Sequence, residues 1–141
     1  MGVTFRNIYD VAEKVFESLG PGHSEFVYRR AMEIEFRRLV INYESEKRIV
    51  INYIDSSGNM YSIGEERLDL YVRTDTDEVI IELKALINPP REMEFSQIHK
   101  YRRELNKTSV FPSYGILINF PQSGTKEARS KIDYFEIKFQ F

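Results

Sequence analysis

The sequence Glu66-Arg67-Leu68-Asp69-Leu70-Tyr71-Val72, followed after residues 73–78 by Val79-Ile80-Ile81-Glu82-Leu83-Lys84-Ala85, decides the fold. Each run is typical of a β-strand, and the stretch between them has no apolar side chain, which indicates a hairpin turn. A hairpin centred between Asp75 and Thr76 pairs Leu68 with Leu83, Leu70 with Ile81, and Val72 with Val79. A slip of one residue would send this apolar ladder to the wrong face, so the pattern also predicts the register.

The same register places two carboxylates across the strand pair. Asp69 lies opposite Glu82, and Lys84 follows two residues further along the same face. Like charges in a cross-strand pair, with Cβ atoms ~5 Å apart, are destabilising unless a shared proton, a cation or a metal offsets them. Two oxygen ligands beside an ammonium suit Mg²⁺-assisted cleavage of a phosphodiester. The alternative is a solvated sheet face on which acids and bases alternate, with Arg67 opposite Lys84.

Composition restricts the class of protein. The 141 residues suffice for one domain, expected over residues 1–141, with its own core. With 20 Lys and Arg against 22 Asp and Glu, the net charge is −2, so any contact with nucleic acid must come from a local basic face. The chain has no cysteine, which excludes disulfides and thiolate metal sites and favours an intracellular protein. No apolar run approaches the ~20 residues of a membrane span, and residues 1–6 do not resemble a signal peptide, so we expect no membrane partner.

Periodicity and turn residues predict the remaining elements. Two helices are expected at residues 8–19 and 24–41, the first ended by Gly20-Pro21-Gly22 and the second capped by Ser24. Strands at 48–54 and 60–63 lead into the hairpin and complete an antiparallel meander. A helix at 91–106 then crosses to a buried strand at 114–120, expected to run parallel to an earlier strand, and residues 134–141 form an edge strand. The order helix, helix, three strands, helix, two strands predicts an α/β domain with a mixed sheet flanked by helices.

Helical spacing assigns faces to the second helix. Its expected core stripe is Val27, Ala31, Ile34 and Ile41. Glu25 begins a neighbouring stripe that mixes acidic and apolar residues. An acid in a first turn is also favoured by the helix dipole alone, by ~0.3–1 kcal/mol, so Glu25 has a structural alternative to a role in a site. Arg29 and Arg30 are expected on the solvated surface.

The helix at 91–106 carries further candidate residues. Gln97 and Tyr101 stand four residues apart on one face, for which an ordinary helix flank is the alternative. Around them lies the densest basic cluster of the chain, made of His99, Lys100, Arg102, Arg103 and Lys107. Such a cluster either serves solubility or binds phosphates.

Three motifs resemble those of a known nuclease superfamily, over residues 8–120. Gly22-His23-Ser24-Glu25-Phe26-Val27-Tyr28 fits the G-x-x-E-x-x-Y signature of a family of small proteins within the PD-(D/E)xK nuclease superfamily. Asp69 and Glu82-Leu83-Lys84 match the superfamily signature of a strand acid followed by E-x-K on the next strand, although leucine rather than proline precedes Asp69. Gln97-Ile98-His99-Lys100-Tyr101 resembles the Q-x-x-x-Y helix motif of RecB-type nucleases, whose upstream helix acid would be Glu25. The histidine of some RecB-type nucleases is not at its usual spacing, so His23 is left out of the ligand set.

This resemblance implies the restriction-endonuclease-like α/β fold and a Mg²⁺- or Mn²⁺-dependent nuclease, with DNA as the expected substrate. Asp69, Glu82 and the backbone carbonyl of Leu83 would hold the metal, and Glu25 would contribute through a second metal or a metal-bound water. Lys84 would position or activate the attacking water. The residues expected to orient site groups or to bind nucleic acid are Gln97, Tyr101, Lys100 and Arg103.

A different class of function remains open. The same fold also suits a non-catalytic nucleic-acid-binding or assembly module, which the near-zero net charge favours and the intact set of two acids and a lysine opposes. Either form could act as a homodimer or with a separate protein partner.

Overall fold

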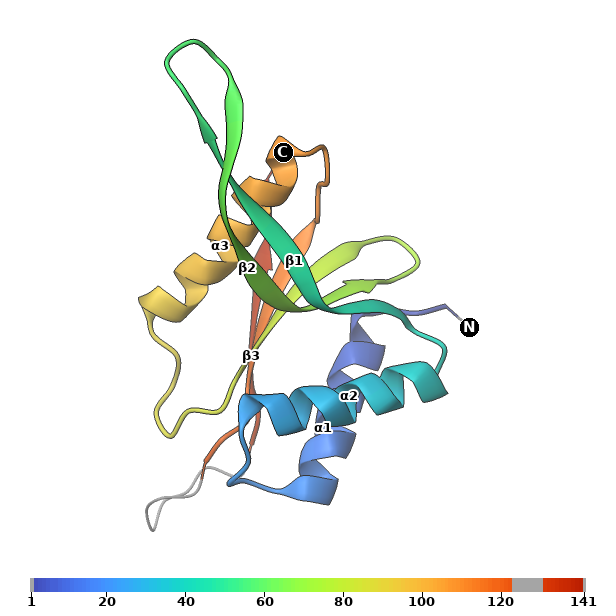
Figure 1. Cartoon of the computed structure of the whole chain (residues 1–141). Coiled ribbons are helices and arrows are strands. Elements are labelled where there is room, and N and C mark those ends of the chain that lie inside the picture. Colours follow the sequence, from blue (N-terminus) through green and yellow to red (C-terminus); the bar gives the residue numbers. More distant parts are fainter. Residues whose placement is uncertain (1, 123–130, 141) are drawn as a thin grey trace.

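The structure is a computed structural model that describes residues 2–122 and 131–140 (Figure 1). Its elements in chain order are α1 (Phe5–Leu19), α2 (Glu25–Arg38), β1 (Asn42–Ile54), β2 (Met60–Arg73), β3 (Glu78–Lys84), α3 (Glu92–Lys107), β4 (Tyr114–Asn119) and β5 (Asp133–Lys138). The predicted order of helices and strands is confirmed. Phe141, at the end of the predicted last strand, lies outside the described residues.

One five-stranded sheet, in the order β1-β2-β3-β4-β5, forms the centre of the molecule. β3 and β4 run parallel and are connected through α3, whereas the other neighbouring strands run antiparallel. This arrangement confirms the predicted meander, the parallel crossover and the edge position of β5. The outer halves of β1 and β2 extend beyond the other strands as a long hairpin (Figure 1).

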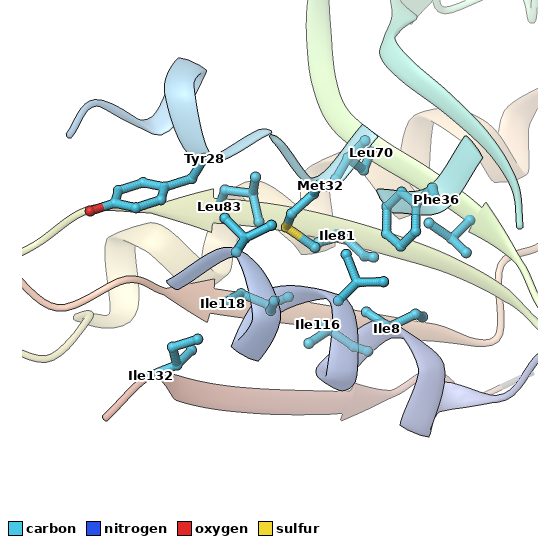
Figure 2. Packing of buried hydrophobic residues seen from close by; sticks show 14 of the residues in the cluster. Ile8, Tyr28, Met32, Phe36, Leu70, Ile81, Leu83, Ile116, Ile118 and Ile132 are labelled. Atoms are coloured by element: carbon cyan, nitrogen blue, oxygen red, sulfur yellow. The ribbon is translucent and has the colours of Figure 1, made fainter. Parts of the chain in front are cut away.

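Helices cover both faces of the sheet. α1 and α2 pack on one face, where Met32 and Phe36 of α2 lie over Leu70 and Ile81 (Figure 2). α3 packs on the other face and forms a second core cluster with β2, β3 and β4. Alternate residues of β3 enter the two clusters, so this strand is buried on both sides. The α3 residues that are buried in the second cluster are Ile98, Tyr101 and Leu105.

The predicted hairpin register is confirmed at its two central pairs, Leu70 with Ile81 and Val72 with Val79. All four side chains lie in the cluster on the α1 and α2 side. The apolar alternation of the two strands is therefore what fixes their pairing.

The predicted third pair, Leu68 with Leu83, is wrong. Leu68 packs in the cluster on the α3 side, whereas Leu83 packs on the α1 and α2 side. In a regular strand Leu68 would share a face with the residue two positions on. Instead the strand turns at Asp69, beside a position of β1 where Glu46 has a left-handed φ of 51°.

α2 presents a different face to the core from the predicted one. Tyr28, Met32 and Phe36 are fully buried, whereas Ile34 is 56% exposed, so its predicted core position is wrong. Of the predicted stripe, Ile41 is buried in the core and Ala31 packs against it. The larger side chains of the neighbouring stripe bury more apolar area, which decides the rotation of the helix. Arg29, expected on the surface, is buried.

α3 also covers part of the free edge of β1. Next to a register shift in this strand, the Asn52 amide donates to Glu104 Oε1 (3.0 Å) and the Asn52 carbonyl accepts from Lys107 Nζ (2.9 Å). Glu104 and Lys107 pair with each other at 2.9 Å. Open backbone groups on an edge strand invite pairing with another chain. Lys107 of the predicted basic cluster is thus engaged with β1.

Gly115 in β4 tests how tightly α3 packs on the sheet. A Cβ at this position would lie 2.4 Å from Ile98 Cγ2 and 3.1 Å from Phe139 Cζ. Gly115→Ala should therefore destabilise the protein by about 1–3 kcal/mol through overpacking, as measured by denaturant unfolding. Ile98→Ala, which removes the Cγ2 methyl, should be less destabilising in the Gly115→Ala background than in the wild type.

Gly64→Ala in β2 is the matched control, because its added Cβ would meet no heavy atom within 4 Å. Its effect should stay within about 0.5 kcal/mol. Equal losses for the two alanine variants would show that the effect comes from replacing a strand glycine and would contradict tight packing at Gly115.

Candidate active site

The candidate site forms where the ladder between β2 and β3 ends. The assigned pairing stops at Leu70 and Ile81, and beyond it carboxylates accept hydrogen bonds from the opposite strand. The Leu83 amide donates to Asp69 Oδ2 (2.8 Å), and the Asp69 amide donates to Glu82 Oε1 (3.2 Å). The structure thus brings Asp69 and Glu82 together, at the place where the hairpin register predicted them.

The two carboxyl groups share surroundings that disfavour two negative charges. Glu82 is 3% exposed. Burial, and after it the charge of Asp69, raise the pKa of Glu82 to about 8. Burial also raises the pKa of Asp69, against the opposing effects of the Leu83 amide, Arg29 and Lys84. In the absence of a cation, the pair therefore retains a proton at neutral pH.

Lys84 is oriented by side chains from α3. Its Nζ donates to Gln97 Oε1 (3.3 Å), and Gln97 Nε2 donates to Tyr101 Oη (3.1 Å). The Tyr101 hydroxyl donates in turn to the backbone carbonyl of Arg67 (3.1 Å). Burial, and after it the charge of Glu82, raise the pKa of Tyr101, so its hydroxyl keeps its proton. Gln97 and Tyr101, predicted from one helix face, thus connect Lys84 to β2.

A pocket of about 450 Å³ opens beside Lys84. Lys100 and Arg103 contribute to its lining together with Lys84. Arg103 is exposed, while Lys100 Nζ lies 2.7 Å from the carboxylate of Glu66. Three cationic side chains from two elements and one acid, Glu94, therefore line this pocket, and the excess of positive charge suits an anionic ligand.

The segment before α2 fixes the start of this helix beside the site. Gly22 has a φ of 102°, a conformation that favours glycine. Ser24 caps the helix as predicted, its hydroxyl accepting from an amide of the first turn (3.4 Å). The Tyr28 hydroxyl donates to the Gly20 carbonyl (2.8 Å), and its ring stacks on Phe120 at 4.3 Å. Tyr28 therefore ties the loop to the core and determines where the first turn of α2 lies.

Glu25 lies in that first turn. Loss of hydration raises the pKa of Glu25, opposed by the charge of Lys84 and reinforced by that of Asp69. Glu25 remains exposed, and among the described residues no three His, Cys, Asp or Glu side chains gather closely enough to hold a metal. Its part in metal binding stays a prediction. His23 Nε2 lies 3.2 Å from the Leu19 carbonyl oxygen.

Comparison with protein families identifies the superfamily of the chain. A family model described as the PD-(D/E)XK nuclease superfamily matches residues 3–132. The chain belongs to this superfamily. The superfamily resemblance predicted from Asp69 and the Glu82-Leu83-Lys84 run is thus confirmed, and the matched residues include all the predicted site residues.

A solved structure of this fold, titled "Crystal structure of SSO0001", is similar with a TM-score of 0.50 and 20% identity, over 79% of this chain and 48% of that chain. This likeness, with the superfamily match, confirms the restriction-endonuclease-like α/β fold. The chain spans about half the length of the solved structure it matches. A search of curated proteins found no match. Within the described residues, none of the helices combines the length and the apolar character needed to cross a membrane.

PD-(D/E)XK nucleases generally use divalent metal ions, and the donors of this chain fit such an ion. Mg²⁺ and Mn²⁺ prefer oxygen ligands, which Asp69, Glu82 and the Leu83 carbonyl would supply. The pKa of Glu82, raised to about 8, indicates that the protein does not fully balance two negative charges at this pair. A divalent cation would balance them.

Sequence reasoning missed a buried ion pair next to the site of this superfamily member. Arg29 Nε lies 3.3 Å from Glu33 Oε2, and the two residues are 8% and 4% exposed. Burial raises the pKa of Asp69, and the charge of Arg29 partly opposes this effect. The spacing of Arg29 and Glu33, four residues apart on the helix, indicates an ion pair in the sequence. It does not indicate burial, because a solvated helix face shows the same spacing of opposite charges.

The raised pKa of Glu82 predicts that the metal-free protein loses stability as the pH rises. Glu82 has an ordinary pKa of 4.5 in the unfolded chain and about 8 in the folded protein, so between these values the folded state binds more protons. The contribution of Glu82 is fully present below pH 4.5 and is lost by about pH 8. Denaturant unfolding across this range, with a chelator present, measures the loss.

Glu82→Gln should remove most of this pH dependence, and Asp69→Asn should weaken it by removing the repulsion. Excess Mg²⁺ should flatten it in the wild type, because binding to the folded state stabilises the ionised pair. Glu17→Gln, at an exposed position of α1, is the control and should leave the dependence unchanged. The same pH dependence in the wild type and in Glu82→Gln would contradict the assignment to Glu82.

Proposed function

We propose that this protein is a Mg²⁺- or Mn²⁺-dependent nuclease that hydrolyses phosphodiester bonds in DNA. The observation that carries the proposal is the convergence of Asp69, Glu82 and Lys84 where β2 and β3 separate. The two carboxylates are held by backbone amides at 2.8 and 3.2 Å, and the ammonium follows two residues after Glu82. Membership of the PD-(D/E)XK nuclease superfamily supports this assignment.

The metal would be held by Asp69, Glu82 and the Leu83 carbonyl, where it would supply Lewis-acid polarisation of the phosphate and acidification of a water. Hydrogen bonds within the protein order the two carboxylate ligands before a metal binds. The Leu83 amide fixes the Asp69 carboxylate and the Asp69 amide fixes that of Glu82, so neither group has to be ordered during binding. Glu25 is proposed to contribute from the first turn of α2.

Lys84 is proposed to orient the attacking water and to stabilise the charge that develops on the phosphate oxygens. Its ammonium donates to Gln97 Oε1 at 3.3 Å, and an ammonium has further donors for a water or a phosphate. Gln97 and Tyr101 hold the Lys84 side chain in place through their link to β2.

The pocket beside Lys84 is the proposed entry for the DNA backbone. Because the net charge of the chain is −2, attraction of a polyanion depends on local cations such as Arg103 and Lys100. Arg103 is exposed, so a phosphate group could reach its guanidinium. Lys100 would exchange its ion pair with Glu66 for one with the substrate.

Two finer relationships belong to the proposal. From Gly22, Glu25 and Tyr28 we infer that the chain is a member of the G-x-x-E-x-x-Y family, and from Gln97 with Tyr101 that it is related to RecB-type nucleases. The hydrogen bonds that connect Gln97 and Tyr101 to Lys84 support the second relationship.

Substitutions of the strand residues separate an enzyme from a binding module. Lys84→Ala should lower Mg²⁺-dependent cleavage of DNA by a factor on the order of 10²–10⁴, because a positioned donor is lost, while binding of metal and DNA persists. Glu82→Ala should lose cleavage and metal binding together. Cleavage assays with calorimetric metal titrations measure both effects.

Lys138→Ala, at an exposed lysine of β5, is the matched control and should cleave like the wild type. A Lys84→Ala protein that cuts as fast as the wild type would show that the active site lies elsewhere. No cleavage by the wild type on single- or double-stranded DNA with either metal would favour the non-catalytic binding or assembly module.

The salt dependence of DNA binding tests the pocket. Replacing both Lys100 and Arg103 by Gln should weaken binding and reduce the slope of log K against log[salt] by about one unit per lost phosphate contact. Folding should change by less than about 0.5 kcal/mol. Arg6→Gln, with a side chain that is 84% exposed on α1, is the control and should keep the wild-type slope. An unchanged slope in the double variant would place the DNA on another face.

A further inference from the structure

A polar stripe runs along α2 from the candidate site into the protein. Glu25, Arg29, Glu33 and Arg37 follow one another at intervals of four residues, alternating in charge, which places them on one helix face. A solvated stripe would be exposed along its length. Here the two middle members are 8% and 4% exposed.

The buried part of this stripe contacts β1 at successive positions. Arg29 Nη2 lies 3.6 Å from Glu46 Oε2, while Glu33 Oε2 accepts from the Ser45 hydroxyl at 2.8 Å. Arg29 and Glu33 pair with each other at 3.3 Å. Further along, Arg37 donates to the hydroxyl of a β1 tyrosine at 2.6 Å. The stripe therefore connects α2 to the first half of β1.

The contacts meet β1 where this strand is distorted. Glu46 has a φ of 51°, a left-handed conformation that is uncommon for a residue other than glycine. Ser45 pairs with Leu70, and Lys47 pairs with Leu68, but no pair is assigned between them at Glu46 and Asp69.

β2 is also irregular next to this position, at Asp69. Leu68 and Leu70, which would share a face in a regular strand, enter opposite core clusters. At this turn the Asp69 amide donates to the Glu82 carboxylate, and the Asp69 carboxylate accepts from the Leu83 amide. The conformation of β1 at Glu46 and the position of the Asp69 carboxylate thus belong to one local geometry.

We propose that Arg29 and Glu33 are positioning residues for Asp69: by holding Ser45 and Glu46 in the distorted conformation, they fix the turn of β2 that presents the Asp69 carboxylate to Glu82. That this positioning serves catalysis rests on the proposed nuclease function. A buried ion pair adds little net stability compared with an apolar pair, but it imposes direction through its hydrogen bonds.

Amide hydrogen exchange followed by NMR tests the positioning without reference to activity. Arg29→Met keeps the length of the side chain but removes its charge and hydrogen bonds. The Asp69 and Leu83 amides should then exchange at least about tenfold faster, whereas the amides of Ile80 and Ile81 in the regular part of β3 should keep their protection. Arg29→Lys retains the charge but lacks the planar guanidinium with its fixed donors, so the increase in exchange rate should be intermediate.

Arg30→Met is the matched control. Arg30 is the next residue of the helix and also lies near Glu33 (3.7 Å), but its side chain is 57% exposed. It should leave all four amides unchanged. If Arg29→Met alone does not fold, the double variant Arg29→Met/Glu33→Met leaves no unpaired buried charge and carries the same test.

Mn²⁺ binding, measured by electron paramagnetic resonance, gives the second readout. Affinity should fall about tenfold or more in Arg29→Met and stay at the wild-type value in Arg30→Met. Wild-type protection of the Asp69 and Leu83 amides in a folded Arg29→Met protein would overturn the proposal. So would an equal loss of protection across β3, because the pair would then serve only general stability. If the wild type binds no Mn²⁺, the proposed nuclease function fails, and the exchange rates still decide the positioning role.

Discussion

The structure depends on two carboxyl groups, Asp69 and Glu82, that are held together where a strand pair opens. Burial strengthens their repulsion by removing the water that would screen it. Backbone amides, the ammonium of Lys84 and the guanidinium of Arg29 offset part of this repulsion. The proton that Glu82 retains offsets the rest. A divalent cation would take the place of that proton, so the electrostatic repulsion in the metal-free site and the proposed metal-dependent function have the same origin.

Such a pair requires a rigid support, which β3 provides. Its residues Val79–Leu83 are buried, with alternate side chains in the clusters on the two faces of the sheet. Glu82 lies between Ile81 and Leu83, so a shift of its backbone would disturb a well-packed core. The two faces also deliver the helices that complete the site. α2 brings Arg29 from one side, and α3 brings Tyr101 with its hydrogen-bonded partner from the other.

The parts of the fold that could be predicted are those in which one physical effect dominates. Apolar alternation gave the pairing of Leu70 with Ile81, and this register placed Asp69 against Glu82 correctly. The same rule failed at Leu68, because β2 turns at Asp69 and strand periodicity carries no information about such a turn. In α2 two stripes competed for the core, and the volume of side chains such as Phe36 decided the outcome. Burial of Arg29 could not be predicted, since its partners in β1 become neighbours only in the folded chain.

α2 illustrates why a sequence motif mixes different kinds of residue. Tyr28 is fully buried and ties the preceding loop to the core, while Glu25, three residues earlier, remains exposed in the first turn. Arg29 continues the helix on the face that meets β1. A single helix therefore has an apolar face that packs in the core and a polar face that contacts β1. Rotating the helix would move all these groups together. The contacts that pack Tyr28 in the core therefore also determine where Glu25 and Arg29 lie.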